Sequence, residues 1–139
     1  MGPNPGMWEQ PIAQGRGIVV TGGFFEAHAT KTTRSPKTGR KIKQQYRFES
    51  GGGTPLLLAT VCGQGCFSVV TTRPNTSVAP VHNRMPLALT LAEARWWLCA
   101  PWPSLVANWQ KLANRERLAL TAAPEQPPAP ATFGQGTLF

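Results

Sequence analysis

Two short segments of the sequence combine an ionisable side chain with a backbone that has to bend or stay stiff. The first is 22–28, Gly-Gly-Phe-Phe-Glu-Ala-His, in which Glu26 follows an apolar run. Partial burial at the end of a strand would raise the pKa of this carboxyl, as general acid or base catalysis requires. The alternative is a glutamate at a strand edge that stays in water.

The second segment is 80–86, Pro-Val-His-Asn-Arg-Met-Pro. Its two prolines favour a stiff, extended chain that presents His82 and Arg84 at alternate positions on one side. An imidazole can transfer protons near neutral pH, and a guanidinium can bind a phosphate through two parallel hydrogen bonds. The alternative for His82 is a core histidine whose hydrogen bonds are all satisfied.

Positive charge is concentrated in one part of the chain. The 139 residues carry 14 Lys and Arg against 6 acids, all glutamate, for a net charge of +8. The acid-free segment 31–47 contributes seven of these bases, and residues 35–40 at its centre have the composition of a turn. We expect either a basic arm that contacts the phosphates of a nucleic acid or a solvated hairpin loop. The candidate DNA-binding residues in this arm are Lys31, Arg34, Lys37, Arg40, Lys41 and Lys43.

Composition argues against several other classes of site and of protein. The absence of aspartate excludes Asp-based triads, and Cys62, Cys66 and Cys99 lie far from both histidines in the sequence. We therefore expect no metal and no cofactor. An odd cysteine count fits a reducing cytoplasm, and no apolar run approaches the ~20 residues that span a bilayer, so no membrane partner is expected.

The elements that would position these residues are mostly short strands. We expect a buried strand over 16–25 that bends at Gly22-Gly23, a half-buried strand over 44–49, and a hairpin of 56–62 and 66–72. A further strand over 78–89 would be broken by Pro80 and Pro86.

Helices are expected only after these strands. Thr90 and Glu93 have the spacing of a capping box, which predicts a short helix through 97–98 that ends at Pro101 and Pro103. Ser104 could cap a second helix, whose buried face would consist of Leu105, Trp109, Leu112 and Ala113. The fold class is therefore α+β, with a mainly antiparallel, barrel-like sheet followed by short helices. We divide the chain into an irregular segment 1–15, a domain 16–120, a Pro/Ala-rich linker 121–134 and a tail 135–139.

The two candidate segments and the residues between them resemble the SOS response-associated peptidase (SRAP) family. The resemblance covers roughly 7–110 and is carried by Gly-Phe-Phe-Glu at 23–26, Thr71-Thr72, Asn75, Val78 and the segment 82–86. It implies single-stranded DNA binding and the capture of abasic sites, with Glu26 and His82 in the active site. It also implies that Arg84 and Thr72 lie near the DNA, and the family name adds peptidase activity at Glu26 and His82 as an alternative.

The resemblance also has departures. The family opens Met-Cys-Gly-Arg, and its cysteine forms a thiazolidine with the abasic aldehyde, whereas this chain has Gly2. Roughly the first third of the family pattern has no counterpart, so we do not expect a stable crosslink. The alternative function is a single-stranded-DNA-binding module with impaired catalysis. Strand edges that lack their usual partner should either associate with another chain or be covered by residues 1–15.

The last five residues, 135–139, resemble the pentapeptide Gln-x-x-Leu-Phe that binds the bacterial sliding clamp. Leu138 and Phe139 would enter a hydrophobic pocket of the clamp, with Gln135 hydrogen-bonded at its rim. The resemblance therefore implies a bacterial sliding clamp as a second partner.

Overall fold

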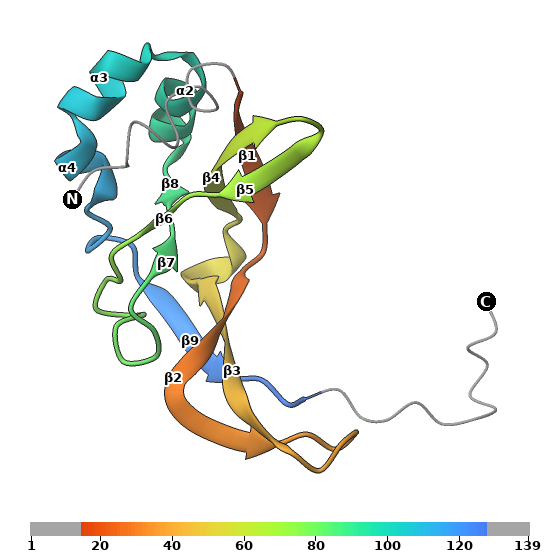
Figure 1. Cartoon of the computed structure of the whole chain (residues 1–139). Coiled ribbons are helices and arrows are strands. Elements are labelled where there is room, and N and C mark those ends of the chain that lie inside the picture. The colour runs from red at the N-terminus through yellow and green to blue at the C-terminus, as the bar shows by residue number, and fades with distance from the viewer. Residues whose placement is uncertain (1–14, 128–139) are drawn as a thin grey trace.

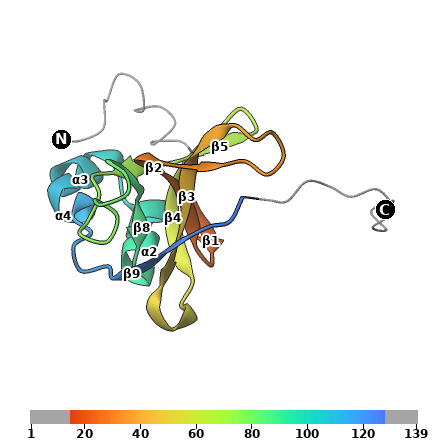
Figure 2. The same ribbon diagram turned by 90° about the horizontal axis from the view of Figure 1, so that it is seen from below.

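A computed structural model describes residues 15–127 as three antiparallel sheets, of four, three and two strands, with short helices at one end (Figure 1). The strands are β1 (Arg16–Thr21), β2 (Phe24–Arg34), β3 (Lys41–Ser50), β4 (Leu56–Gly63), β5 (Cys66–Val69), β6 (Thr71–Thr72), β7 (Met85–Pro86), β8 (Ala88–Leu89) and β9 (Leu120–Pro124). The two-stranded sheet consists of β6 and β7. The helices are the 3₁₀ turn η1 (Gly51–Gly53), α2 (Leu91–Cys99), α3 (Trp102–Ala107) and α4 (Trp109–Ala113). Viewed from below, the helices lie to one side of the sheets (Figure 2).

Strand β4 is the centre of the first sheet and supplies side chains to two hydrophobic clusters. It pairs with β1 along most of its length, with β8 near its start and with β5 over its second half. Successive side chains of a strand point to opposite faces. Ala59 and Val61 accordingly pack with the helices around Trp97, whereas Leu56 and Leu58 pack in a second cluster.

The second sheet, in the order β2-β3-β9, carries the polar residues of interest. At its base, the buried rings of Phe24 and Phe48 stack with centroids 5.1 Å apart and join the second cluster. The register of β2 against β3 shifts between Ala27 and Thr32, which marks a bulge. Beyond it, the hairpin projects away from the helices (Figure 1).

The α+β class with mainly antiparallel strands is confirmed, but the sheets of residues 15–127 do not close into a barrel. The bend at Gly22-Gly23 is present, and it divides the first expected strand into β1 and β2. The strand expected over 78–89 is wrong in its first half, which forms a turn, and only β7 and β8 follow it.

The capping box of α2 is present as predicted. Thr90 Oγ1 accepts from Glu93 N at 3.2 Å, and the Glu93 carboxylate accepts from Thr90 N at 2.9 Å. The role expected of Ser104 as a cap is wrong, because α3 begins at Trp102 with Pro103 in its first turn, where proline loses no helical hydrogen bond. The four residues expected on one buried face, Leu105, Trp109, Leu112 and Ala113, are all buried, although the helix is interrupted at Asn108.

The linker expected over 121–134 is also wrong at its beginning. Residues Leu120–Pro124 form β9, which pairs with β3 from Ser50 to Tyr46. A strand at a sheet edge is held by backbone hydrogen bonds, so a Pro/Ala-rich composition does not exclude it. The segment 1–14, residues 128–134 of the expected linker and the tail 135–139 lie outside the described residues. Within the described part, β1 pairs on one side only, and none of the helices is long and apolar enough to cross a membrane.

Candidate functional site

Glu26 and His82 lie close together, although the sequence places them in separate segments. Glu26 Oε2 is 3.7 Å from His82 Nδ1, and the two side chains retain 21% and 32% of their exposure. This distance is longer than a direct hydrogen bond, so neither group is fully committed to the other. The pair is partly buried and remains open to a third molecule.

A backbone contact between β2 and the turn before His82 brings the two side chains together. Glu26 lies opposite Tyr46 in the β2–β3 register, two residues beyond the buried Phe24. Farther along β2, Ala29 N donates to the carbonyl of Val81 at 2.8 Å. This bond between distant segments places the residue after Val81, which is His82, beside the strand that carries Glu26.

His82 stands at the end of a tight turn and not on an extended chain, which corrects the sequence prediction. His82 N and Val81 N both donate to the carbonyl of Val78, at 3.0 and 2.8 Å. Arg84 N then donates to His82 Nδ1 at 3.2 Å, so the chain folds back around the ring. His82 Nδ1 also lies 3.2 Å from the carbonyl oxygen of Arg84, so this nitrogen accepts or donates according to the tautomer of the ring.

Asn75 organises this turn, a role that its place in the sequence motif does not indicate. Its side chain is buried, and its amide nitrogen donates to the carbonyls of Arg115 and Leu118 at 2.9 and 2.8 Å. Its amide oxygen accepts from the backbone nitrogens of Ser77 and Val78 at 3.0 and 3.2 Å. Asparagine next to turn residues is a sequence signal for such a cap, but the two carbonyls lie some forty residues later.

Burial raises the pKa of the Glu26 carboxyl above its usual range, and the nearby His82 only partly offsets this effect. The direction agrees with the expectation from the sequence. A carboxyl with a raised pKa retains its proton closer to neutral pH, where it can donate it to a bound substrate. The pair thus combines a proton donor with an imidazole that can accept or donate.

Arg84 and Thr72, both expected near DNA, occupy different environments. The exposed Arg84 guanidinium donates to Thr71 through Nη2, to the carbonyl at 2.9 Å and to Oγ1 at 3.0 Å. Its position is fixed, and it remains accessible to a phosphate. Thr72 is buried, and its hydroxyl donates to the carbonyl of Ala113 at 3.0 Å, so in this structure it supports the fold.

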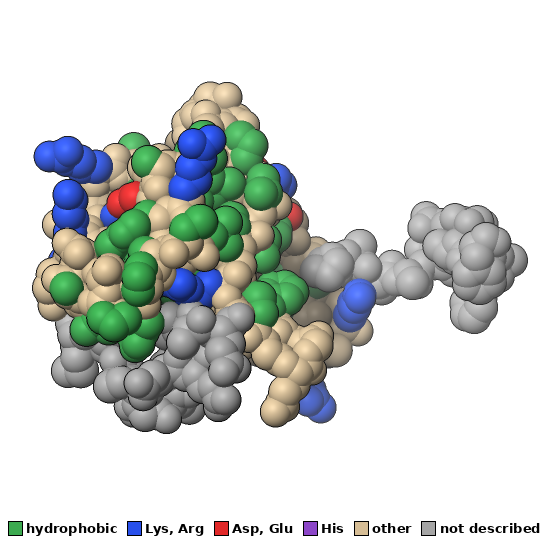
Figure 3. Space-filling view, turned by 90° about the horizontal axis from the view of Figure 1, so that it is seen from above, with side chains coloured by type: hydrophobic (Ala, Val, Ile, Leu, Met, Phe, Trp, Pro, Cys, Tyr) green, Lys and Arg blue, Asp and Glu red, His purple; other side chains and the backbone are tan. Residues whose placement is uncertain are grey.

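The basic arm is the β2–β3 hairpin, and its tip is the turn that the sequence predicts. Ser35 N donates to Arg40 O at 2.9 Å, Arg34 Nη1 donates to Gly39 O at 2.8 Å, and Gly39 has φ +69°. A positive φ strains most other residues, which explains the glycine. All six candidate bases are exposed: Lys31, Arg34, Lys37, Arg40, Lys41 and Lys43. The helix end, seen from above, instead combines apolar side chains with isolated charges (Figure 3).

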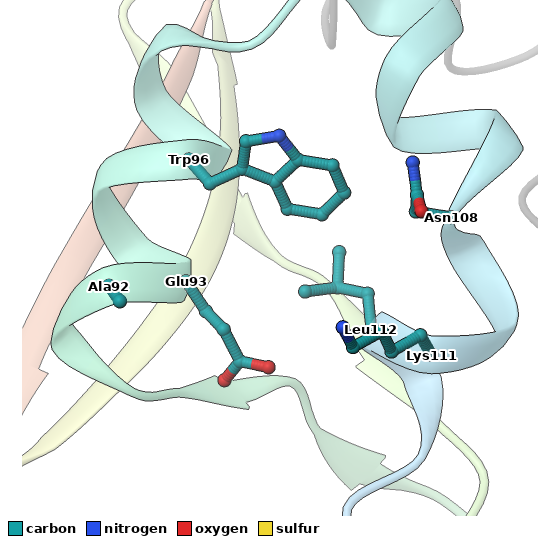
Figure 4. Close-up of a pocket in the computed structure, with 6 residues that line it drawn as sticks. All are labelled: Ala92, Glu93, Trp96, Asn108, Lys111 and Leu112. Atoms are coloured by element: carbon teal, nitrogen blue, oxygen red, sulfur yellow. The ribbon is translucent and has the colours of Figure 1, made fainter.

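A cleft of about 400 Å³ lies between α2 and α4, where Trp96 and Leu112 point toward each other (Figure 4). Neither Glu26 nor His82 lines it. The Glu93 carboxylate in its wall accepts from both Arg115 nitrogens at 2.7 Å, which lowers the pKa of Glu93. This carboxylate is held by its partners as part of the fold.

The cysteines and histidines form no recognisable metal centre in the described range. Cys62 is half-buried, Cys66 and Cys99 are exposed, and all three are free thiols. Between residues 15 and 127, no three His, Cys, Asp or Glu side chains come together as metal binding would require.

Comparison with known proteins gives a family match and several structural matches. The family model described as SOS response associated peptidase (SRAP) matches residues 3–125. A phage-related protein from Bordetella bronchiseptica has a TM-score of 0.59 and 26% identity, and the match covers 86% of this chain and 57% of the Bordetella protein. A protein from Bacteroides thetaiotaomicron has a TM-score of 0.57 and 25% identity, over 84% of this chain and 52% of its own.

A second Bordetella bronchiseptica protein, with a TM-score of 0.58 and 17% identity over 85% of this chain and 58% of its own, is similar in fold. The chain thus spans between half and three-fifths of the length of these solved relatives. No curated protein matches the sequence significantly.

Proposed function

Because the chain belongs to the SOS response associated peptidase (SRAP) family, we propose that it acts in the DNA-damage response by binding single-stranded DNA and processing or capturing abasic sites. The observation that carries this proposal is the partly buried Glu26–His82 pair, with 3.7 Å between the carboxylate oxygen and the imidazole nitrogen. The basic arm and Arg84 supply positive charge for the phosphates of the strand.

The chemistry at the pair follows from the two side-chain types. An abasic sugar is in equilibrium with a ring-opened aldehyde, and a protonated Glu26 can donate to the ring oxygen as the ring opens. Glu26 recovers a proton from the C1′ hydroxyl as that group becomes the aldehyde. When an amine adds to the aldehyde, Glu26 donates this proton to the resulting hydroxyl, which leaves as water and gives a Schiff base. His82 can take up the proton released by the nucleophile and pass it to a leaving oxygen. Arg84 would hold a neighbouring phosphate during these steps.

The direct test uses a single-stranded oligonucleotide with one abasic site, incubated with the full chain and then denatured. We expect strand scission at the abasic site or an adduct that borohydride traps, and about 100-fold slower reaction for Glu26→Gln and for His82→Ala, the range typical of lost acid-base catalysis. Asn83→Ala is the matched control, because Asn83 is the exposed neighbour of His82. Unchanged rates for both site variants would refute the assignment of the pair.

The form of the product separates the alternatives. An adduct that survives denaturation without reductant indicates a stable linkage, whereas an adduct seen only after borohydride treatment indicates a reversible Schiff base with an amine. Measurable affinity for single-stranded DNA without either product would favour a binding module with impaired catalysis. Cleavage of a peptide substrate that depends on Glu26 and His82 would favour the peptidase alternative.

We further propose that the tail 135–139 binds the bacterial sliding clamp, on the strength of its sequence pattern. A clamp contact would place the protein on replicating DNA, in the cytoplasm, where single strands are exposed. The test compares clamp binding by the full chain with that of the double variant Leu138→Ala, Phe139→Ala, with Thr137→Ala as the control. Equal affinity of the double variant and the unmodified chain would exclude this contact.

A further inference from the structure

A second polar cluster lies beside Glu26 on the hairpin, and it consists of His28, Lys31 and Tyr46. Glu26 and Tyr46 are direct partners in the β2–β3 register, so their side chains project from the same face of the sheet. The ring of His28 lies 5.8 Å from the ring of Tyr46, centroid to centroid. Lys31 Nζ donates to the Tyr46 hydroxyl at 3.2 Å and lies 5.9 Å from the centre of its ring.

The β-bulge fixes the position of Lys31. His28 Nδ1 accepts from the backbone nitrogens of Thr30 and Lys31, at 3.1 and 2.9 Å. These bonds turn the chain where the β2–β3 register shifts, and they bring the lysine side chain back toward Tyr46. Because Nδ1 accepts both bonds, the neutral ring carries its hydrogen on Nε2.

The groups of this cluster that remain free for a ligand are hydrogen-bond donors. The Tyr46 hydroxyl accepts from Lys31, which leaves its own hydrogen free to donate, and the ammonium group of Lys31 has two further hydrogens. His28 adds the hydrogen on Nε2. The neighbouring carboxyl of Glu26 lies instead at His82. A group of donors with one positive charge suits an anion with several acceptor oxygens, such as a phosphodiester.

The position of the cluster along the hairpin identifies which phosphate this would be. From the tip of the arm, β2 runs back through Arg34 and Lys31 to Glu26, and β3 runs through Lys43 to Tyr46. Lys31 lies between Arg34 and Glu26 along β2, and its side chain reaches Tyr46, so the cluster lies between the tip of the arm and the Glu26–His82 pair.

We propose that His28, Lys31 and Tyr46 form a phosphate subsite for single-stranded nucleic acid, which holds the nucleotide next to the one at Glu26 and His82. The inference rests on the proposed function in taking the Glu26–His82 pair as the reaction site. The Tyr46 hydroxyl and the Lys31 ammonium donate to the same phosphate, and Tyr46 therefore acts in binding and positioning.

The test measures the affinity of the full chain for a fluorescent, intact oligothymidylate as a function of salt, by anisotropy. Tyr46→Phe removes only the hydroxyl, and we expect about tenfold weaker binding with the salt dependence unchanged, as for a lost hydrogen bond to a charged group. Lys31→Gln should weaken binding and lower the slope of log K against log salt by about 0.7, the value for one phosphate of a single strand.

Lys37→Gln at the hairpin tip is the matched control for Lys31→Gln, because it removes the same charge from the same exposed arm. In double-variant cycles, the Tyr46 and Lys31 substitutions should be non-additive and the Tyr46 and Lys37 substitutions additive, since only the first pair shares a phosphate. Equal affinity of Tyr46→Phe and the unmodified chain, additivity of the first cycle, or no binding of the oligonucleotide would each overturn the subsite.

The intact probe separates this inference from the abasic-site reaction. Adduct formation together with a fully active, fully binding Tyr46→Phe variant would overturn the subsite and leave the proposed function standing. Weakened binding of Tyr46→Phe without any abasic-site product would support the subsite and count against the proposed reaction.

Discussion

Substituting Asn75 tests whether the turn before His82 depends on hydrogen bonds to residues 115 and 118, far away in the sequence. The side chain is only 2% exposed, and it makes four hydrogen bonds, two as donor to the carbonyls of Arg115 and Leu118 and two as acceptor. Asn75→Ala removes all four. We expect a lower free energy of unfolding and a displaced His82.

The expected decrease in the free energy of unfolding is the sum of what the lost hydrogen bonds contribute. A net hydrogen bond contributes about 1 kcal/mol, so the two donor bonds to Arg115 and Leu118 account for about 2 kcal/mol. The acceptor bonds contribute less, because Val78 N also donates to the Asn75 backbone carbonyl, at 3.1 Å. The loss should therefore be about 3 kcal/mol, which corresponds to a decrease in Tm of about 10 °C for a domain of this size.

The measurement is urea unfolding of the full chain, followed by circular dichroism, with Asn83→Ala as a control that should stay within about 0.5 kcal/mol. Asn75→Asp adds a sharper comparison. A carboxylate keeps the acceptor bonds but faces the Arg115 and Leu118 carbonyls with its own lone pairs, so it should be at least as destabilising as alanine. A loss below 1 kcal/mol for Asn75→Ala would show that the turn does not depend on these bonds.

Three further outcomes follow from the titrating groups and the helix cap. Because the pKa of Glu26 is raised in the folded state, the native state loses stability as pH rises from 4.5 through the folded-state pKa. In urea titrations, Glu26→Gln should therefore be more stable than the unmodified chain at pH 7. Well below pH 4.5 the two proteins should have the same stability. The lowered pKa of Glu93 has the opposite sign: its contribution is present above 4.5 and is lost as pH falls through the folded-state pKa. Glu93→Gln should therefore be less stable at pH 7 and converge with the unmodified chain in acid, and equal stability at pH 7 would contradict the role of Arg115. Thr90→Ala should lower the free energy of unfolding by about 1 kcal/mol through loss of the cap, and an unchanged midpoint of thermal unfolding would exclude that contribution.

Local chemistry explains which elements could be predicted from the sequence. The bend at Gly22-Gly23, the turn over 35–40 and the capping box at Thr90 each depend on residues within a few positions of one another. Turn residues and caps act at that range, so their positions were correct. The apolar run of β4 before the turn at Gly63 likewise predicts a strand, although it does not say which face meets the helices.

The elements that sequence reasoning missed depend on contacts between distant segments. Strand β9 exists because the backbone of β3 is available to pair with it, and its own composition is that of a linker. The turn before His82 is likewise closed by Asn75, whose partner carbonyls belong to residues 115 and 118. Periodicity within a short window contains no information about either pairing.

The same distant contacts determine how the Glu26–His82 pair should be interpreted. At 3.7 Å and with both side chains partly exposed, mutual attraction contributes at most about 1 kcal/mol, which is too little to fix two segments of chain. The backbone bond from Ala29 to Val81 and the buried Asn75 instead hold His82 from either side. Each member of the pair should therefore keep its position when the other is replaced. A loss of reaction in Glu26→Gln or His82→Ala with the fold intact would then report the missing proton transfer, since the scaffold that positions the remaining group does not depend on the substituted one.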